Sequence, residues 1–419
     1  MDQRPNIVYL HTHDTGRCIS PYGFAIDTPN MSRIAGEGVL FRQAFSCAPT
    51  CSPSRAGLLT GETPHQAGML GLAHFGWSLT RPERHLARVL SGYGYHTALA
   101  GMQHVAEHTE RIGYDELLVP ERPWTVDRVA GPARRFLSGG VPEPFFLSVG
   151  FEEAHRPFHD PEHVENGENG RAFSPLLPGL PDTPEIRADV AAYAASIRRA
   201  DEGFGEVLAA LEAAPLDRET VVMLTTDHGP PFPGAKGTLT DRGIGVMLAM
   251  CGPFPLRGGG EVDAMVSHLD VAPTLFELMG EEPPPWYQGS SLLQLLDGRA
   301  RRLHSHLFAE STTHVADEPM RALRSERYKY IRRFAETPAR EPANCDDSPS
   351  KEAYERAGWF RMPVEREELY DLLFDPLECC NLIETPALQT TADELRAELR
   401  DRMQRTADPL AGSWPDVQR

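Results

Sequence analysis

The sequence predicts an α/β protein in which helices flank a large mixed, mostly parallel sheet, followed by a smaller C-terminal unit. Several short apolar runs have the length of buried strands, and each is followed by a cluster of polar residues. In an open α/β sheet, polar residues after the carboxyl ends of the strands form the binding site. These runs are residues 6–10, 97–100, 144–151 and 220–226. An amphipathic segment over residues 183–211 predicts a long helix. The composition shifts near residue 301, so we expect a larger domain over 1–315 and a smaller one over 316–419.

The C-terminal unit is expected to hold a short antiparallel sheet and one helix. Residues 320–324 and 327–331 are predicted to form paired strands, and the polar stretch 338–349 is predicted to be a loop. A helix over residues 391–406 is expected to pack on that small sheet.

The charge balance excludes some classes of partner. The formal net charge is −19, and no basic block is present that could neutralise phosphates, so nucleic acid is not expected as a partner. The same charge argues against a long polyanionic substrate. A small anionic substrate remains compatible with it, because a few cationic side chains can reverse the sign of the potential locally.

Neither a membrane span nor a disulfide framework is expected. No apolar run reaches the roughly 18 residues that a transmembrane helix needs. The N-terminus leads into the first strand without the basic and apolar regions of a signal peptide, which predicts a cytoplasmic protein. The seven cysteines are odd in number and irregularly spaced, so reduced thiols are expected, and no zinc-type spacing occurs.

The segment CSPSRAGLLTG, which begins at Cys51, predicts a helix whose N-terminus carries chemistry. Ser52 or Ser54 is expected to cap the free amides, and Gly61 is placed to end the helix. Cys51 would lie at the positive end of the helix dipole, where a nucleophile and a bound anion are both favoured. Arg55 lies one turn further along and can face the same way. On these grounds alone, a capped helix with a buried cysteine is an equally good interpretation.

The pattern Cys-x-Pro-x-Arg from Cys51, followed by Leu-Thr-Gly, resembles the signature of the type I, formylglycine-dependent sulfatases. The resemblance implies the alkaline-phosphatase-like sandwich fold of that superfamily. It also implies that a formylglycine-generating enzyme oxidises Cys51 to formylglycine, whose hydrated aldehyde is the nucleophile, and that Arg55 supports it. The similarity extends over nearly the whole chain, including the C-terminal residues 368–382.

The resemblance also implies one divalent cation beside Cys51. Its expected ligands are residue 51 itself and the residues that follow the first and the last predicted strands: His13 and Asp14, and Asp227 and His228. The family has aspartate where this chain has His13. Carboxylates favour Ca²⁺ or Mg²⁺, and imidazoles favour Mn²⁺, Fe²⁺ or Zn²⁺. Ca²⁺ is the expected ion because sulfatases usually hold it, with Mn²⁺, Mg²⁺ and Zn²⁺ as alternatives.

Further catalytic residues are implied by matches at other predicted strand ends. His104 and Lys236 match family residues that contact the sulfate, and His155 matches the histidine that protonates the leaving group. The family mechanism then transfers the sulfuryl group to the formylglycine diol, with Arg55 and Lys236 offsetting negative charge. Met102 departs from the family, which has a lysine at this position.

The stretch over residues 63–69 looks most like the N-sulfoglucosamine sulfohydrolases, the heparan sulfamidase branch of the family. His74 lies where that branch has a histidine-rich substrate loop, and Arg156 follows the candidate acid His155. His74 and Arg156 are therefore predicted to bind substrate. The expected partner is a small anion, either a sulfated sugar or an aryl or alkyl sulfate.

Three functions remain compatible with these residues. The first is a sulfatase that hydrolyses a sulfate ester or an N-sulfate. The second is a phosphonate monoester or phosphodiester hydrolase of the same superfamily, which His228 and Met102 favour. The third, a protein that keeps the fold but only binds anions, is disfavoured because the nucleophile, the ligands and the acid are all present.

Overall fold

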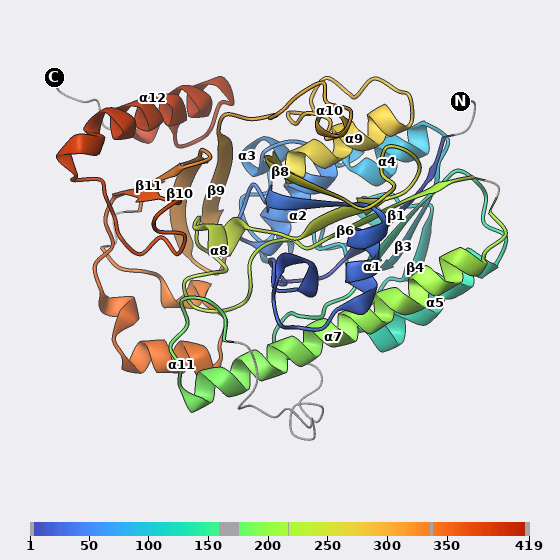
Figure 1. Ribbon diagram of the computed structural model, residues 1–419, viewed down its shortest axis with the longest axis horizontal. Helices are drawn as coiled ribbons and strands as arrows, with labels where there is room; N and C mark the ends of the chain where they lie inside the picture. The colour runs from blue at the N-terminus through green and yellow to red at the C-terminus, as the bar shows by residue number, and fades with distance from the viewer. Residues whose placement is uncertain (1–3, 159–175, 217, 336–337, 415–419) are drawn as a thin grey trace.

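The computed structural model describes residues 4–158, 176–216, 218–335 and 338–414, and its main feature is an eight-stranded sheet with helices on both faces (Figure 1). The strand order is β4-β3-β5-β1-β6-β7-β2-β8. The strands are β1 (Asn6–His11), β2 (Val39–Phe45), β3 (His96–Gly101), β4 (Glu116–Val119), β5 (Phe145–Gly150), β6 (Thr220–Thr225), β7 (Leu248–Cys251) and β8 (Gly260–Ser267).

The four apolar runs are confirmed as strands β1, β3, β5 and β6, and they lie next to one another in the sheet. β1 pairs in parallel with β5 and β6, and β5 pairs in parallel with β3. β7 runs antiparallel to its neighbours β6 and β2, and β8 is again parallel to β2. The predicted mixed, mostly parallel sheet is therefore confirmed, and the carboxyl ends of four adjacent strands meet at one edge.

Alternating side chains of β1 enter two separate cores. Val8 and Leu10 pack with helices α1, α5 and α7 on one face, whereas Ile7 and Tyr9 pack with α4 and α9 on the other. In Figure 1, α5 and α7 run along one side of the sheet, and α4 and α9 lie on the opposite side. These helices are α1 (Pro29–Glu37), α4 (Leu86–Gly92), α5 (Val126–Ser138), α7 (Pro184–Ala213) and α9 (Val271–Leu278).

The long helix predicted over residues 183–211 is confirmed as α7. The Thr183 hydroxyl accepts a hydrogen bond from the amide of Ile186 and so caps the first turn. The other helices are α2 (Cys51–Thr60), α3 (Pro64–Ala67), α8 (Asp241–Ile244), α10 (Leu293–Leu296), α11 (Pro349–Arg356) and α12 (Gln389–Arg405). Short 3₁₀ turns lie at Ser20–Tyr22, Ala73–Phe75, Pro82–Arg84, Thr109–Arg111, His268–Asp270, Pro342–Asn344, Trp359–Arg361, Pro386–Leu388 and Ala411–Ser413.

A second, four-stranded antiparallel sheet lies in the C-terminal region, in the order β12-β11-β10-β9. Its strands are β9 (Leu307–Thr313), β10 (Asp317–Arg324), β11 (Tyr328–Arg333) and β12 (Glu367–Asp371). Both predicted strands and the predicted helix are confirmed, and α12 packs Leu399 and Met403 against Leu323 of this sheet. The sheet begins at Leu307, before the expected domain boundary.

The polar stretch 338–349 is mostly irregular, as predicted, but it contains one 3₁₀ turn (Pro342–Asn344) and the first residue of α11. Within the described part of the chain, none of the helices has the length and apolar character that crossing a bilayer requires.

Candidate active site

The first part of the site follows β1. The backbone of Asp14 is left-handed, with φ of 53°, which is unusual for a residue other than glycine. The amide of Asp14 donates to Oδ1 of Asp227 (2.9 Å), and the Tyr193 hydroxyl donates to the carbonyl of Asp14 (3.0 Å). These bonds hold His13 and Asp14 at the carboxyl end of the strand, where the sequence predicts metal ligands.

The second part follows β6 and is joined to the first by Arg55. Nη2 of Arg55 donates to the Thr12 carbonyl (2.9 Å) and to Oδ2 of Asp227 (3.0 Å). Nη1 of Arg55 lies 2.8 Å from Nδ1 of His11. The guanidinium therefore connects the ends of β1 and β6 from helix α2. As predicted, Arg55 and Cys51 face the same region.

Helix α2 begins at Cys51 and is buried along its whole length. It ends at Gly61, whose φ of 67° is the predicted left-handed C-cap. The expected serine cap is wrong. Thr50 is the N-cap residue and makes no side-chain cap bond. Ser52 and Ser54 lie inside the first turn, and their hydroxyls bond to other segments. Ser52 accepts from the amide of Ala73, and Ser54 donates to the carbonyl of Asp227.

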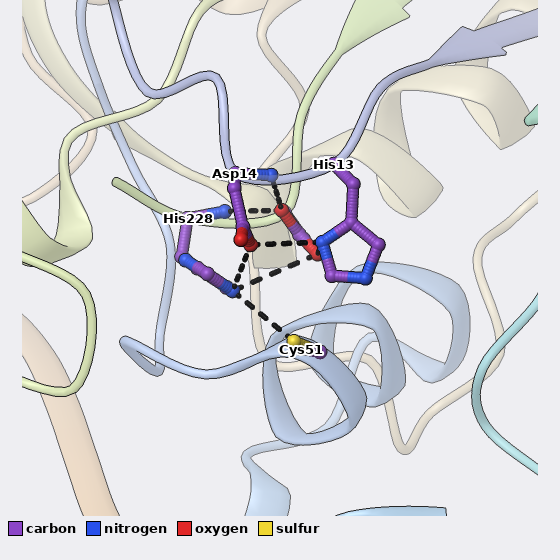
Figure 2. Close-up of side chains that lie close together, drawn as sticks. His13, Asp14, Cys51 and His228 are labelled. Atoms are coloured by element: carbon purple, nitrogen blue, oxygen red, sulfur yellow. Dashed lines mark hydrogen bonds and ion pairs between the residues drawn. The ribbon is translucent and has the colours of Figure 1, made fainter. Parts of the chain in front are cut away.

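Five potential ligand atoms converge at the N-terminus of α2, all within 4.8 Å of one another. Nδ1 of His13 lies 2.8 Å from Oδ1 of Asp14 and 3.0 Å from Oδ2 of Asp227. Nε2 of His228 lies 3.1 Å from Oδ1 of Asp14 and 3.4 Å from Sγ of Cys51 (Figure 2). Two buried carboxylates and two imidazoles form a donor set that fits one divalent cation.

The surroundings favour the ligating protonation states of His13 and Asp227, but not of an unmodified Cys51. Burial lowers the pKa of His13 to about 4, so its imidazole is neutral near pH 7. Burial alone would raise the pKa of Asp227, but His13, His228 and Arg55 together lower it. Burial raises the pKa of the Cys51 thiol, so an unmodified Cys51 is a neutral thiol.

Lys236 lies beside this cluster and carries a positive charge. Its ammonium donates to Oδ2 of Asp14 (2.9 Å) and to Oδ2 of Asp346 (2.8 Å). Burial opposes the charge, but the two carboxylates more than offset it and raise the pKa of Lys236. Asp346 comes from the stretch that was predicted only as a loop.

A cavity of about 220 Å³ opens above Cys51 and brings together most of the predicted catalytic side chains. His155 packs edge-on against His13, with ring centroids 4.4 Å apart. His74 and His104 stack in parallel, and Nδ1 of His74 lies 3.2 Å from Nε2 of His104. The lining residues are His13, Cys51, Leu72, His74, Phe75, Met102, His104, Arg122, Trp124, His155, His314, Val315 and Asp346.

Arg156 differs from the other candidates because its guanidinium is already paired. Nη1 and Nη2 donate to the two oxygens of Asp189 on α7, at 2.6 and 2.7 Å. Arg156 lines a neighbouring hollow of about 340 Å³ together with His155 and Arg122. The structure thus places Arg156 beside the main cavity, among the groups that anchor α7.

Several polar residues of the site had no role in the sequence-based prediction, among them Arg122, which lines the cavity. His11 contacts Arg55, Asp346 contacts Lys236, and His314 lines the cavity. His11 precedes the His13–Asp14 pair at a strand end, a position that could have suggested it. Nothing local distinguishes Asp346 or His314, because they reach the site only through the packing of the C-terminal region.

The parallel sheet, with its buried ligand cluster beside the N-terminus of α2, defines an α/β enzyme of the sulfatase type. Sequence comparison agrees: residues 5–281 match the family described as Sulfatase, which is more than half of the chain. The chain belongs to the sulfatase family. Residues 236–357 also match the C-terminal region of N-sulphoglucosamine sulphohydrolase, so the predicted likeness to that branch is confirmed.

Individual relatives are consistent with this assignment. The chain is 31% identical to human N-sulphoglucosamine sulphohydrolase, over 92% of this chain and 87% of the relative. It is 26% identical to an ulvan-active sulfatase of Formosa agariphila, over 95% and 74% of the two chains. A solved 2-O GAG sulfatase has the same fold, with a TM-score of 0.78, 23% identity and coverage of 99% and 94%.

Proposed function

We propose that this protein is a sulfatase that uses a formylglycine at position 51 and one divalent cation to hydrolyse a sulfate ester or an N-sulfate. The single observation that carries the proposal is the position of Cys51. Its side chain lies within the ligand cluster of His13, Asp14, Asp227 and His228, at the base of a cavity. The similarity to a sulphohydrolase and to several sulfatases supports the same reaction.

The cluster would hold the cation through His13, Asp14, Asp227 and His228, with the residue at position 51 beside them. When bound, the cation supplies Lewis-acid polarisation, and a hydrated formylglycine supplies an oxygen nucleophile. Ca²⁺ is the proposed ion because two carboxylates suit a hard cation, and Mn²⁺, Mg²⁺ and Zn²⁺ are the alternatives.

The other side chains have separate tasks in this proposal. Arg55 and Lys236 offset negative charge on the substrate oxygens. His155 donates a proton to the leaving oxygen or nitrogen, and its contact with His13 keeps it at the edge of the cluster. His104 assists release of sulfate, and its bond to His74 orients the ring. His74 and Arg156 contact the substrate in this proposal, since His74 lines the cavity and Arg156 lines the adjoining hollow.

One observation favours a second candidate, a phosphonate monoester or phosphodiester hydrolase. Met102 lines the cavity at the position of the family lysine, so the site has one cation fewer than the resemblance implies. A phosphodiester and a sulfate ester both carry a single negative charge, so the remaining cations suit either of them.

We expect a formylglycine-generating enzyme as a partner during maturation, and a cytoplasmic location stays a prediction.

The test is to produce the protein with and without a formylglycine-generating enzyme and to identify residue 51 by peptide mass spectrometry. Sulfate esters, an N-sulfated sugar and a phosphodiester are then compared as substrates. We expect sulfate release that rises with the converted fraction and is absent in Cys51→Ala. Cys47→Ala is the matched control, since Cys47 is an equally buried cysteine outside the cluster. An unmodified thiol in a host that modifies this motif, or turnover of the phosphodiester alone, would contradict the proposal.

A further inference from the structure

One carboxylate in the cavity has no task in the proposed chemistry. Asp346 lines the cavity, its side chain is 18% exposed, and its Oδ2 accepts from Lys236 at 2.8 Å. Lys236 also donates to Asp14, so two carboxylates share one ammonium. An acidic side chain in a site for an anion weakens attraction for the anion itself, and it therefore needs another explanation.

The loop that carries Asp346 is held at several points. Oδ1 of Asn344 accepts from the amides of Val315 and Ala316, which fixes the loop to the turn between β9 and β10. The hydroxyl of Ser350 donates to Asp189 on α7. Asp346 lies between these two anchors, so its carboxylate is held in place before any ligand arrives.

The second oxygen of Asp346 accepts no hydrogen bond from the described residues. Within the described residues, Oδ2 is bonded to Lys236, and no hydrogen bond to Oδ1 is present. An ionised carboxylate accepts hydrogen bonds and donates none. A ligand in this cavity that carries a hydroxyl or ammonium donor would therefore find a matching acceptor in Asp346, next to the Lys236 ammonium.

We propose that Asp346 is a specificity residue that accepts a hydrogen bond from a hydroxyl or amino group of a sulfated sugar ring. Sugars carry such donors on the carbon atoms next to the sulfated position, whereas simple aryl and alkyl sulfates carry none. This inference rests on the proposed sulfatase function and narrows its substrate class. A hydrogen bond to a charged group is worth roughly 10- to 100-fold in selectivity when the site is built around it.

The test compares wild type, Asp346→Ala and Asp346→Asn, each with residue 51 converted to formylglycine. The substrates are N-sulfoglucosamine and p-nitrophenyl sulfate. Asp347→Asn is the matched control, because Asp347 is the next residue, is 99% exposed and pairs with Lys351. For Asp346→Ala we expect kcat/KM on the sugar to fall by about 10- to 100-fold, mainly through KM, with little loss on the aryl sulfate. Asp346→Asn retains an acceptor oxygen and should lose less.

Equal losses on both substrates would show that Asp346 only positions Lys236, and unchanged sugar kinetics would also overturn the inference. A binding experiment gives a result that does not depend on turnover. Calorimetry with N-sulfoglucosamine compares Cys51→Ala with the Cys51→Ala, Asp346→Ala double variant, and the double variant should bind at least about tenfold more weakly. If wild type with formylglycine at position 51 releases no sulfate from any substrate, the proposed function fails. The binding comparison still decides the role of Asp346.

Discussion

Nη2 of Arg55 lies 3.0 Å from Oδ2 of Asp227, and the two side chains are 1% and 0% exposed. The pair joins residues that are far apart in the sequence, one on helix α2 and one after strand β6. Arg55 also donates to the Thr12 carbonyl beyond β1, so one guanidinium holds three chain segments around the ligand cluster. A buried pair of this kind is costly to break, because each partner is left as an isolated charge.

We therefore expect Arg55→Ala to lower the free energy of unfolding by about 3 to 5 kcal/mol. The Asp227 carboxylate would lose its arginine partner while staying buried among His13 and His228. Urea denaturation followed by circular dichroism would measure the change. Arg42→Ala is the control, since Arg42 pairs with Glu261 at the exposed surface and its loss should change little. Equal small effects of both substitutions would contradict this role for Arg55.

Removing one carboxylate of the cluster should remove the metal. In Asp227→Ala we expect less than stoichiometric divalent cation by elemental analysis, together with loss of sulfate release, because half of the anionic charge of the donor set is gone. Full metal content in Asp227→Ala would show that the cation binds elsewhere.

His13 is expected to determine which cation binds. His13→Asp should shift the metal content towards harder cations such as Ca²⁺ and Mg²⁺, because an oxygen ligand replaces an imidazole. Elemental analysis of protein loaded from an equimolar mixture of cations would measure the shift. An unchanged profile would mean that His13 is not a ligand.

Met102 is expected to favour singly charged substrates. Met102→Lys adds a cation to the cavity wall, and an added cation interacts more strongly with a dianionic phosphate monoester than with a monoanionic sulfate ester. One charge pair at about 4 Å is worth on the order of 4 kcal/mol at an effective dielectric of about 20, before desolvation is subtracted.

The measurement for Met102 is the ratio of the activity on a dianionic phosphate monoester to the activity on a monoanionic sulfate ester. The ratio should move towards the dianion in Met102→Lys and stay unchanged in Met102→Leu, which keeps the volume without the charge. An unchanged ratio in a folded, metal-loaded lysine variant would show that position 102 does not contact the substrate.

A second buried cluster should make stability depend on pH. Nδ1 of His65 lies 2.8 Å from Oε1 of Glu310 and 3.9 Å from Asp408, and Arg321 pairs with both carboxylates. Burial alone would lower the pKa of His65, but Glu310 more than offsets this and the pKa is raised. A raised pKa in the folded state stabilises the protein fully below the unfolded pKa of about 6.5. This stabilisation is lost as pH rises through the folded value.

The difference in unfolding free energy between wild type and His65→Gln should therefore be larger near pH 5.5 than near pH 9. The lower pH lies below the unfolded-state histidine pKa of about 6.5, and the higher pH lies well above it. Denaturant melts at the two pH values would measure it. In a Glu310→Gln background the pH dependence should become smaller, because the carboxylate bonded to His65 is gone and only the more distant Asp408 still favours its charge. A difference that does not change with pH would contradict the assignment.

The sequence alone determined the α/β class, the positions of four main strands along the chain, and the polar residues that follow those strands. Strands β1, β3, β5 and β6 are recognisable because a parallel strand covered on both faces is a continuous apolar run. Since such strands end at one edge of the sheet, the polar residues that follow them converge whatever the details of packing. This geometry brings Asp14 and Asp227 together, and the family resemblance is what predicts them to be ligands. Gly61 was predictable separately, because glycine readily adopts the left-handed conformation that ends a helix.

Only the tertiary structure decided how charged side chains are paired. Arg156, which is predicted to bind substrate, forms a bidentate pair with Asp189 on α7. Oδ2 of Asp346, in a stretch predicted only to be a loop, lies 2.8 Å from Nζ of Lys236. The serine hydroxyls that were expected to cap α2 are bonded to other segments. Local patterns encode the period and the ends of helices and strands, whereas a hydrogen bond between distant residues depends on which elements pack together.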